Sequence, residues 1–401
     1  MKVAIMGYGV VGSGVAEVIG KNAEVIAKKT GILPELSHIL DIRDFPGDPF
    51  ASFLTKEFAD ILEDDETGIV VETMGGLEPA FTFVSACLER GKHVVTSNKE
   101  LVAQKGDVLL ALAEKHNVNF LFEASVGGGI PIIRPLIRCL AGNRIQEIAG
   151  ILNGTTNFIL TKMIMEDMDF ADALALAQKK GYAEKDPTAD VAGIDACRKI
   201  CILASLAFGT HIYPDGVPTK GITDVTLDDV KAAAAAGYVI KLIASAKQLE
   251  NGRLALRVSP TLVKKESMLA GVNGVFNACL VRGDAVGDVL LYGQGAGKLA
   301  TASAVVGDVI DCAAHDSARI RFGWSKAENG VLEAPAAVPT VLFARIKNAD
   351  KAAVAVALPG ASCLDGENGE TLVITAQAPA GALEEALAAF APITVLPVAA
   401  Y

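Results

Sequence analysis

The chain has 401 residues, of which 51% are hydrophobic, and its formal net charge is −11 at pH 7. A chain of this length and composition is globular and too long for one ordinary core, so we expect two or three domains. The acidic balance argues against nucleic acid or an acidic membrane surface as a partner and favours a protein that handles small molecules.

The N-terminal stretch "KVAIMGYGVVGSGVAEVI" predicts a strand, a glycine-rich turn and a helix. Gly7, Gly9 and Gly12 have the GxGxxG spacing. The first glycine permits the tight turn, the second lets a pyrophosphate approach the backbone, and the third lets helix and strand pack closely. Because the motif lies between a strand and a helix, whose N-terminus favours an anion, it predicts a dinucleotide-binding α/β fold.

The second strand is expected in "ELSHILDIRD", residues 35–44, and its end bears on the choice of cofactor. An acid there binds the ribose hydroxyls of NAD, whereas a basic residue pairs with the phosphate of NADP. Both types occur, as Asp41 and Arg43, and strand alternation would put them on one face. The choice between NAD and NADP stays open, as does the alternative that Arg43 only forms a surface ion pair with Asp44.

Two further buried parallel strands are predicted in "GIVVETMGG" and "GKHVVTSNK", with a helix between them. In such sheets, ligands lie beyond the carboxyl ends of the strands. Thr73, Ser97 and Lys99 occupy those ends, so Lys99 is placed to reach the reactive end of the cofactor. The alternative for Lys99 is an ordinary solvated charge.

The stretch "VNFLFEASVGGGIPIIRPL" predicts a strand ending at Glu123 and a loop of small residues from Ser125 to Gly129. Backbone carbonyls of this loop could hold a hard cation together with the Glu123 carboxylate. A flexible crossover between domains is the competing interpretation.

A strand, a polar turn and a helix are expected in "IAGILNGTTNFILTKMIMEDM", where the hydroxyls of Thr155 and Thr156 could cap the helix. A helix from about Asp190 to Phe208 follows. Asp195 and Lys199 are four residues apart on it, an arrangement that is often only a surface ion pair.

Apolar residues surround almost the whole of that helix, which indicates that it is buried. Buried charges are costly unless they face each other or a polar ligand. With Glu184 and Asp190 just upstream, the arrangement predicts a polar pocket for a small zwitterion. Carboxylates would hold its amino group, and Lys199 would face a developing oxyanion.

The remaining elements are predicted in chain order. "VKAAAAAGYVIKLIASAKQL", residues 230–249, is expected to be a helix, and "GRLALRVSPTLV" and "GVFNACLVRG" are expected to be strands. The stretch "VLLYGQGAGKLATASAVVGDVIDCA" predicts a glycine-rich turn and a long helix that returns to pack on the first domain.

Six ordered stretches together resemble the homoserine dehydrogenase family, and the resemblance runs to about residue 316. They are "GYGVVGSGV", "VVTSNKELVA", "EASVGGGIPII", "GILNGTTNFIL", "GYAEKDPTADVAGIDACRK" and "LLYGQGAGKLATASAVVGDVID". The resemblance implies reversible reduction of L-aspartate 4-semialdehyde to L-homoserine with NADPH or NADH, NADP being slightly favoured, by a cytoplasmic homodimer.

The resemblance also implies a domain plan. A Rossmann-like doubly wound dinucleotide-binding domain spans 1–125 and is completed by a returning helix near 297–316. An α+β substrate-binding and dimerisation domain spans 126–296, a linker 317–340, and a small α+β ACT-like domain 341–401.

Site residues follow from the same resemblance, position by position. Lys199 matches the proton donor and Lys99 a second catalytic lysine. The substrate ligands are Gly181, Glu184, Asp190 and Asp195. The cofactor ligands are Gly7, Gly9, Val10, Val11, Gly12, Arg43, Thr73, Ser97, Lys99, Gly181 and Gly297. A site for a monovalent cation such as sodium comprises Glu123, Val126, Gly128 and Ile130.

The C-terminal segment departs from the family pattern. Its strands and helices alternate as in a shortened ACT domain, but "NADKAAVAVAL" lacks the usual proline-glycine at the helix start, where such domains commonly bind an amino acid. Regulation by threonine is therefore doubtful, and a domain kept for packing or dimerisation is the alternative.

Two other functions compete with this one. A related amino-acid dehydrogenase, acting for instance on aspartate, is disfavoured by the segment 181–199 and by the two lysines. A non-catalytic NADP-binding sensor or scaffold is disfavoured because it would not need Lys199 as a proton donor. Seven cysteines without a CxxC pair indicate reduced thiols in the cytoplasm, and no apolar run predicts a membrane span.

Overall fold

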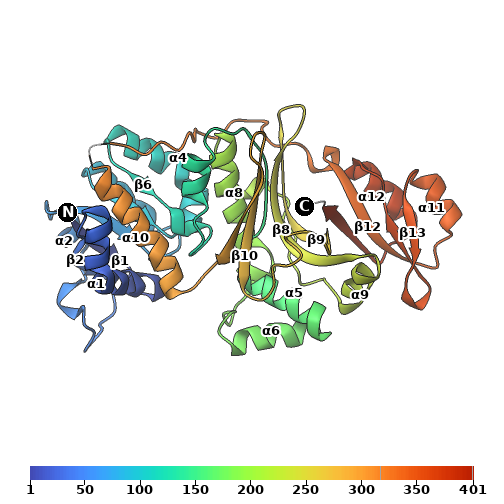
Figure 1. Cartoon of the computed structure of the whole chain (residues 1–401), viewed down its shortest axis with the longest axis horizontal. Helices are drawn as coiled ribbons and strands as arrows, with labels where there is room; N and C mark the ends of the chain where they lie inside the picture. The colour runs from blue at the N-terminus through green and yellow to red at the C-terminus, as the bar shows by residue number, and fades with distance from the viewer. Residues whose placement is uncertain (317, 400) are drawn as a thin grey trace. The chain divides into compact units, whose positions relative to one another are not determined.

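The computed structural model describes residues 1–316, 318–399 and 401, which form two compact units (Figure 1). Unit 1 comprises Met1–Arg144, Cys201–Pro214 and Gly293–Glu328. Unit 2 comprises Ile145–Ile200, Asp215–Tyr292 and Asn329–Tyr401. None of the helices in the described part of the chain combines the length and apolar character that crossing a bilayer requires.

Unit 1 contains a six-stranded sheet in the order β3-β2-β1-β4-β5-β6, and all of its strand pairs are parallel. The strands are β1 (Lys2–Met6), β2 (Glu35–Leu40), β3 (Leu54–Thr55), β4 (Thr67–Glu72), β5 (His93–Thr96) and β6 (Phe120–Leu121). The order reverses direction between β1 and β4, which is the switch point where such sheets bind ligands. The predicted doubly wound parallel sheet is thus confirmed.

Helices cover this sheet, and one of them comes from far along the chain. They are α1 (Val10–Thr30), α2 (Phe58–Leu62), α3 (Ala80–Glu89), α4 (Lys99–Lys115) and α10 (Lys298–Ala314). Figure 1 shows α10, in orange, among the blue elements of the N-terminus. Val305 and Val309 of α10 share an apolar core with Val15 and Ile19 of α1, so the expected return of this helix to the first domain is confirmed.

Unit 2 is built on a second, mixed sheet in the order β11-β10-β7-β8-β9-β16-β12-β14-β13, with β15 paired to β12. Its first strands are β7 (Ile145–Ile151), β8 (Tyr238–Gln248), β9 (Leu254–Lys264), β10 (Phe276–Gly283) and β11 (Gly287–Gln294). The helices of this part of the chain are α5 (Gly154–Glu166), α6 (Phe170–Lys179), α7 (Thr188–Val191), α8 (Ile194–Phe208) and α9 (Leu227–Ala235).

The predicted helix over residues 230–249 is wrong in its second half. Helix α9 ends at Ala235, Gly237 takes a left-handed φ of 87°, and Tyr238 begins the eleven-residue strand β8. Strand β8 lies between β7 and β9, and most of its residues are buried. A central strand buried on both faces gives a continuous apolar run, which periodicity alone does not distinguish from a buried helix.

The C-terminal segment continues the sheet of unit 2. It contains β12 (Pro339–Lys347), α11 (Lys351–Ala357), β13 (Ser362–Asp365), β14 (Glu370–Ile374), β15 (Ala378–Pro379), α12 (Ala380–Ala388) and β16 (Thr394–Ala399). Strand β16 pairs in parallel with β9, with Val398 opposite Leu262. The ACT-like character of this segment, and the division into three domains with a linker, remain predictions.

Candidate functional site

The loop between β1 and α1 has the backbone shape that its glycines predict. Gly7 has a φ of 93°, and a Cβ added to Gly12 would lie 1.9 Å from the Gly7 carbonyl oxygen. Gly9 is the N-cap of α1, and a Cβ there would meet nothing within 4 Å. The loop is therefore tight where helix and strand meet and open at Gly9, as close approach of a pyrophosphate requires. Val10 and Val11 follow as the first residues of α1.

The carboxyl ends of β4 and β5 border the same loop. The Thr73 hydroxyl donates to the carbonyl oxygen of Gly7 over 2.8 Å. Glu72 is fully buried and accepts hydrogen bonds from the Thr96 hydroxyl and the Met74 backbone N–H. Burial raises the pKa of the Glu72 carboxyl. These hydrogen bonds hold the loops that follow β4 and β5 in place.

Three further predicted cofactor residues lie at the starts of helices or in the loops before them. Ser97 follows β5, and Lys99 is the half-buried first residue of α4, whose N-cap Asn98 accepts a hydrogen bond from the Leu101 backbone N–H. Gly297 is the N-cap of α10, with a φ of 126°.

The end of β2 differs from the prediction. The strand ends at Leu40, so alternation does not apply to Asp41 and Arg43. The Arg43 guanidinium donates two hydrogen bonds of 2.9 Å to the Asp41 carboxylate, which also accepts from the Tyr8 backbone N–H. The pairing of Arg43 with Asp44 is therefore wrong.

This ion pair changes what each side chain can offer a cofactor. The Arg43 side chain stays 58% exposed, whereas that of Asp41 is 6% exposed. The Arg43 guanidinium also holds the pKa of the Asp41 carboxyl at about 2. The Asp41 carboxylate is therefore ionised and buried, and both of its oxygens already accept hydrogen bonds. The Arg43 side chain is exposed to solvent.

Glu123 lies just beyond β6, in a short 3-10 turn. Its carboxylate accepts three backbone N–H bonds of 2.7–2.8 Å, from Ile132, Ile133 and Arg134. A Cβ on Gly128 would lie 2.3 Å from the Gly295 carbonyl oxygen, so only glycine fits there. The carboxylate is thus fixed in position and already partly occupied.

Four of the predicted substrate and catalytic side chains belong to unit 2, and three of them lie together. The Lys199 ammonium is 2.7 Å from the Asp195 carboxylate and also donates to the Leu152 carbonyl oxygen over 2.8 Å. Both side chains are at most a tenth exposed, so the expected pairing is present and is not a surface pair. Asp190 lies in the short helix α7 and shares a hydrogen-bond donor with Asp195.

That donor, Asn153, is a residue that the sequence analysis did not single out. Its amide nitrogen is 2.7 Å from Asp190 Oδ1 and 2.9 Å from Asp195 Oδ2. It is also the N-cap of α5, a role predicted for the hydroxyls of Thr155 and Thr156. A polar residue between a strand and "GTT" is a sequence signal for an N-cap, but its tertiary partners have no local signal.

Gly181 and Glu184 form none of the hydrogen bonds described for this cluster. Both are exposed, in the loop between α6 and α7, and Gly181 has a φ of 75°. Among the described residues, the Glu184 carboxylate forms no ion pair with Lys199, and only its backbone oxygen accepts a bond, from Gln178.

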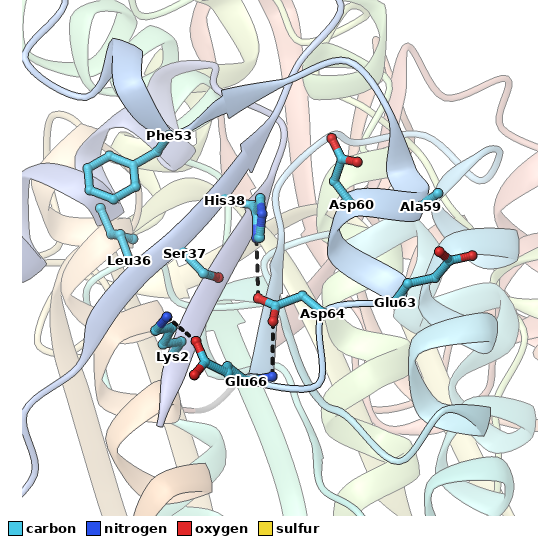
Figure 2. A pocket seen from close by; sticks show the side chains of 10 residues that line it. All are labelled: Lys2, Leu36, Ser37, His38, Phe53, Ala59, Asp60, Glu63, Asp64 and Glu66. Atoms are coloured by element: carbon cyan, nitrogen blue, oxygen red, sulfur yellow. Dashed lines mark hydrogen bonds and ion pairs between the residues drawn. The ribbon is translucent and has the colours of Figure 1, made fainter.

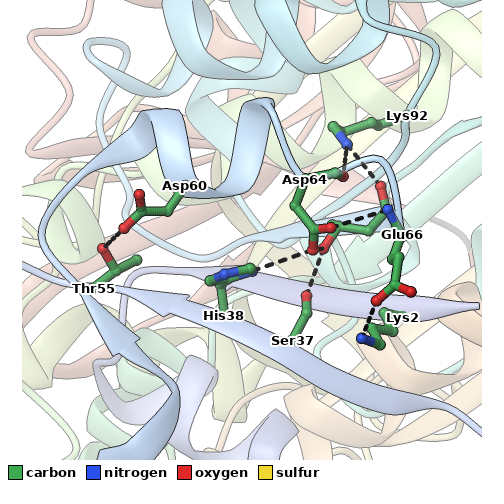
Figure 3. Close-up of polar contacts among 9 residues, drawn as sticks. Lys2, Ser37, His38, Thr55, Asp60, Asp64, Glu66 and Lys92 are labelled. Carbon is green, nitrogen blue, oxygen red and sulfur yellow. Dashed lines mark hydrogen bonds and ion pairs between the residues drawn. The ribbon is translucent and has the colours of Figure 1, made fainter.

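A hollow of about 610 Å³ lies in unit 1, at the ends of the strands opposite to the glycine loop. Figure 2 shows side chains from β1, β2 and α2 around it. Figure 3 shows polar contacts that link them, including the ion pair of Lys2 with Glu66 and the contact of His38 with Asp64. It is at the amino ends of the strands, whereas ligands of such sheets bind at the carboxyl ends. It is therefore not the cofactor site.

Comparison with family models gives two matches, one to the N-terminal region and one to the region that follows it. Residues 7–123 match the model described as homoserine dehydrogenase, NAD binding domain, and residues 131–310 match the model described as homoserine dehydrogenase.

Individual relatives agree with these models. The chain is 46% identical over 312 residues to a homoserine dehydrogenase of Pseudomonas aeruginosa, and the match covers 78% of this chain and 72% of that protein. It is similar to the crystal structure of a homoserine dehydrogenase from Thiobacillus denitrificans, with a TM-score of 0.92, 35% identity, and coverage of 100% and 98%. A hyperthermophilic archaeal homoserine dehydrogenase in complex with NADPH matches 78% of this chain and 97% of its own, with a TM-score of 0.67 and 29% identity.

Proposed function

Because the chain belongs to the homoserine dehydrogenase family, we propose that it catalyses the reversible reduction of L-aspartate 4-semialdehyde to L-homoserine. The observation that carries this proposal is the buried pair of Asp195 and Lys199 in unit 2. Burying an ammonium is costly, and a carboxylate beside it offsets the cost while keeping the proton available.

The proposed chemistry uses Lys199 as the proton donor. When bound, the nicotinamide cofactor supplies the hydride to the aldehyde carbon, which leaves negative charge on oxygen. Lys199 donates a proton to that oxygen, and Lys99 acts as a second ammonium that stabilises the charge. In the oxidation direction a lysine must first lose its proton, so alkaline pH favours that direction.

Carboxylates of unit 2 provide the binding site for the substrate amino group in this proposal. Asp190 and Asp195 converge on one amide and lie beside Lys199, which suits a zwitterion with a carbonyl at its far end. Glu184 and Gly181 are proposed to contribute from their exposed loop. That loop contains Gly181 with a positive φ, where a residue other than glycine would be strained.

NADP is the preferred cofactor in this proposal. The exposed Arg43 guanidinium is available to a ribose phosphate, whereas the Asp41 oxygens that would bind ribose hydroxyls are occupied. The archaeal relative whose structure contains NADPH is consistent with this preference.

A monovalent cation near Glu123 is also proposed, with carbonyl oxygens of Val126, Gly128 and Ile130 as its other ligands. No described residue outside this loop donates a hydrogen bond to these three carbonyls, and oxygen ligands suit a hard cation. Such an ion would bind the loop that follows β6 and fix its shape.

The proposals for the assembly and the location of the chain rest on the family resemblance and not on individual contacts. A homodimer formed through unit 2 and a cytoplasmic location follow from the family resemblance. The C-terminal segment is proposed to serve packing or dimerisation, because β16 is part of the sheet of unit 2.

The test is homoserine-dependent reduction of NADP and of NAD by the purified chain. Turnover with NADP above that with NAD supports both the activity and the cofactor preference. Cofactor binding without turnover in either direction would instead identify an NADP-binding sensor or scaffold.

A further inference from the structure

We propose that Asn153 is a positioning residue of the active site, which holds Asp190 and Asp195 in one arrangement and through Asp195 places Lys199. The inference rests on the proposed function and goes beyond it, because it assigns to an uncharged residue the geometry of the three charged ones.

The first observation is that the side-chain amide of Asn153 is completely used. Its nitrogen has two N–H bonds, and these match the two carboxylate oxygens of Asp190 and Asp195 at 2.7 and 2.9 Å. Its oxygen accepts from the backbone N–H and the hydroxyl of Thr156, at 2.8 and 2.9 Å. Asn153 is 5% exposed. An amide with two donors and two acceptor positions, all satisfied inside the protein, has one orientation.

The second observation is electrostatic. Two carboxylates that share one nitrogen repel each other, and an uncharged donor to both reduces that repulsion without adding charge. The Lys199 ammonium is hydrogen-bonded to Asp195, and the Asn153 amide joins that carboxylate to Asp190. Asn153 therefore links Asp190 to the ion pair.

The third observation is that consecutive residues hold both partners of the ion pair. Leu152 accepts a hydrogen bond from the Lys199 ammonium through its carbonyl oxygen, and Asn153 donates one to Asp195. Both residues lie between the end of β7 and the start of α5. Lys199 and Asp195 are thus both hydrogen-bonded to the turn at Leu152 and Asn153, and both also belong to one helix.

The test separates positioning from helix capping by comparing two substitutions. Asn153→Ser keeps an N-cap side chain but cannot bridge two carboxylates. Asp350→Ser is the matched control, because Asp350 is the N-cap of α11 and its exposed carboxylate accepts from the Ala352 backbone N–H. Both variants and the parent are assayed for homoserine oxidation with NADP across pH 7 to 10, and their melting temperatures are recorded.

For Asn153→Ser we expect the KM for homoserine to rise and kcat to fall, each by about tenfold, because a hydrogen bond to a charged group is lost at each acid. The KM for NADP should not change. The pH profile should move to higher pH. Without the hydrogen bonds from Asn153, the carboxylates of Asp190 and Asp195 would stabilise the charged form of Lys199 more strongly. Asp350→Ser should match the parent.

Three outcomes would overturn the inference. Unchanged kinetics in Asn153→Ser would show that the bridge is not needed. A lower melting temperature with unchanged kinetics and pH profile would show a cap and nothing more. Absence of homoserine turnover in the parent would refute the proposed function itself, and the inference with it.

Discussion

Lys199 and Asp195 form an ion pair of 2.7 Å, one turn apart on α8, with side chains that are 10% and 5% exposed. An exposed pair at this spacing contributes only a few tenths of a kcal/mol. In the interior, loss of one partner leaves an uncompensated charge. The site and the stability of unit 2 are therefore linked through these two residues.

Substitution of Asp195 by asparagine should affect both properties. We expect a loss of about 3 kcal/mol in the free energy of unfolding, because the Lys199 charge stays buried without its carboxylate, and a rise in the KM for homoserine. Urea unfolding and steady-state kinetics measure the two effects. Glu166→Gln is the matched control, since Glu166 forms an i,i+4 pair with Lys162 that is partly exposed. Equal stability of the two variants would contradict the account.

Substitution of Arg43 by alanine should change cofactor preference. We expect kcat/KM for NADP to fall by about tenfold or more, because a charge-assisted contact to phosphate is lost. The kcat/KM for NAD should stay the same or rise, because the Asp41 carboxylate no longer accepts from Arg43 and can accept from the ribose hydroxyls. Arg90→Ala, which removes a similarly exposed arginine of unit 1, should leave the ratio unchanged. An equal loss for both cofactors in Arg43→Ala would refute this role.

The buried Arg345 of β12 should stabilise the C-terminal segment against α9. Its guanidinium is 2.6 Å from Asp229 and 2.7 Å from Glu370. Arg345→Met should therefore cost about 3 kcal/mol at pH 7. Arg253→Met, at a half-exposed pair with Glu333, should cost much less.

The cost of Arg345→Met should depend on pH. Burial acts to raise the pKa of Asp229, but hydrogen bonds from Thr226 and Arg345 outweigh it and hold the pKa below its usual range. A carboxyl with a depressed folded pKa contributes stability above its unfolded pKa of about 3.9 and loses it as pH falls through the folded value. Urea titrations at pH 7 and pH 3 should show the difference between parent and variant shrinking at low pH. A constant difference would contradict the ion-pair explanation.

Lys241 of β8 gives a pH dependence of the same sign in the alkaline range. It is fully buried and donates to the Val272 carbonyl oxygen, and burial lowers its pKa to about 8. Between that value and the unfolded pKa of about 10.4, the unfolded chain binds the extra proton, so stability rises with pH. Relative to Lys241→Met, the parent should gain about 2–3 kcal/mol from pH 8 to pH 10.5. Lys247→Met, at an exposed position of the same strand, should show no such trend.

The elements with strong local signals were predictable from the sequence. The glycine loop before α1, the parallel strands β4 and β5, and the pairing of Asp195 with Lys199 each depend on residues a few positions apart. The family resemblance added roles for those residues that spacing alone does not give.

The errors occurred where tertiary context decides. Strand β8 was predicted as a helix because its burial on both faces erases the alternation of a strand. Arg43 was considered a partner of Asp44, whereas β2 ends at Leu40 and its loop folds Arg43 onto Asp41. Asn153 was missed because its two acidic partners lie about forty positions along the chain.

The central claim is that Lys199 is the proton donor in homoserine turnover. The most direct measurement is homoserine-dependent reduction of NADP by the parent and by Lys199→Ala, with cofactor binding measured separately by fluorescence. We expect turnover to fall by about a hundredfold or more in the variant while the Kd for NADPH holds. Comparable turnover in the two proteins would contradict the claim.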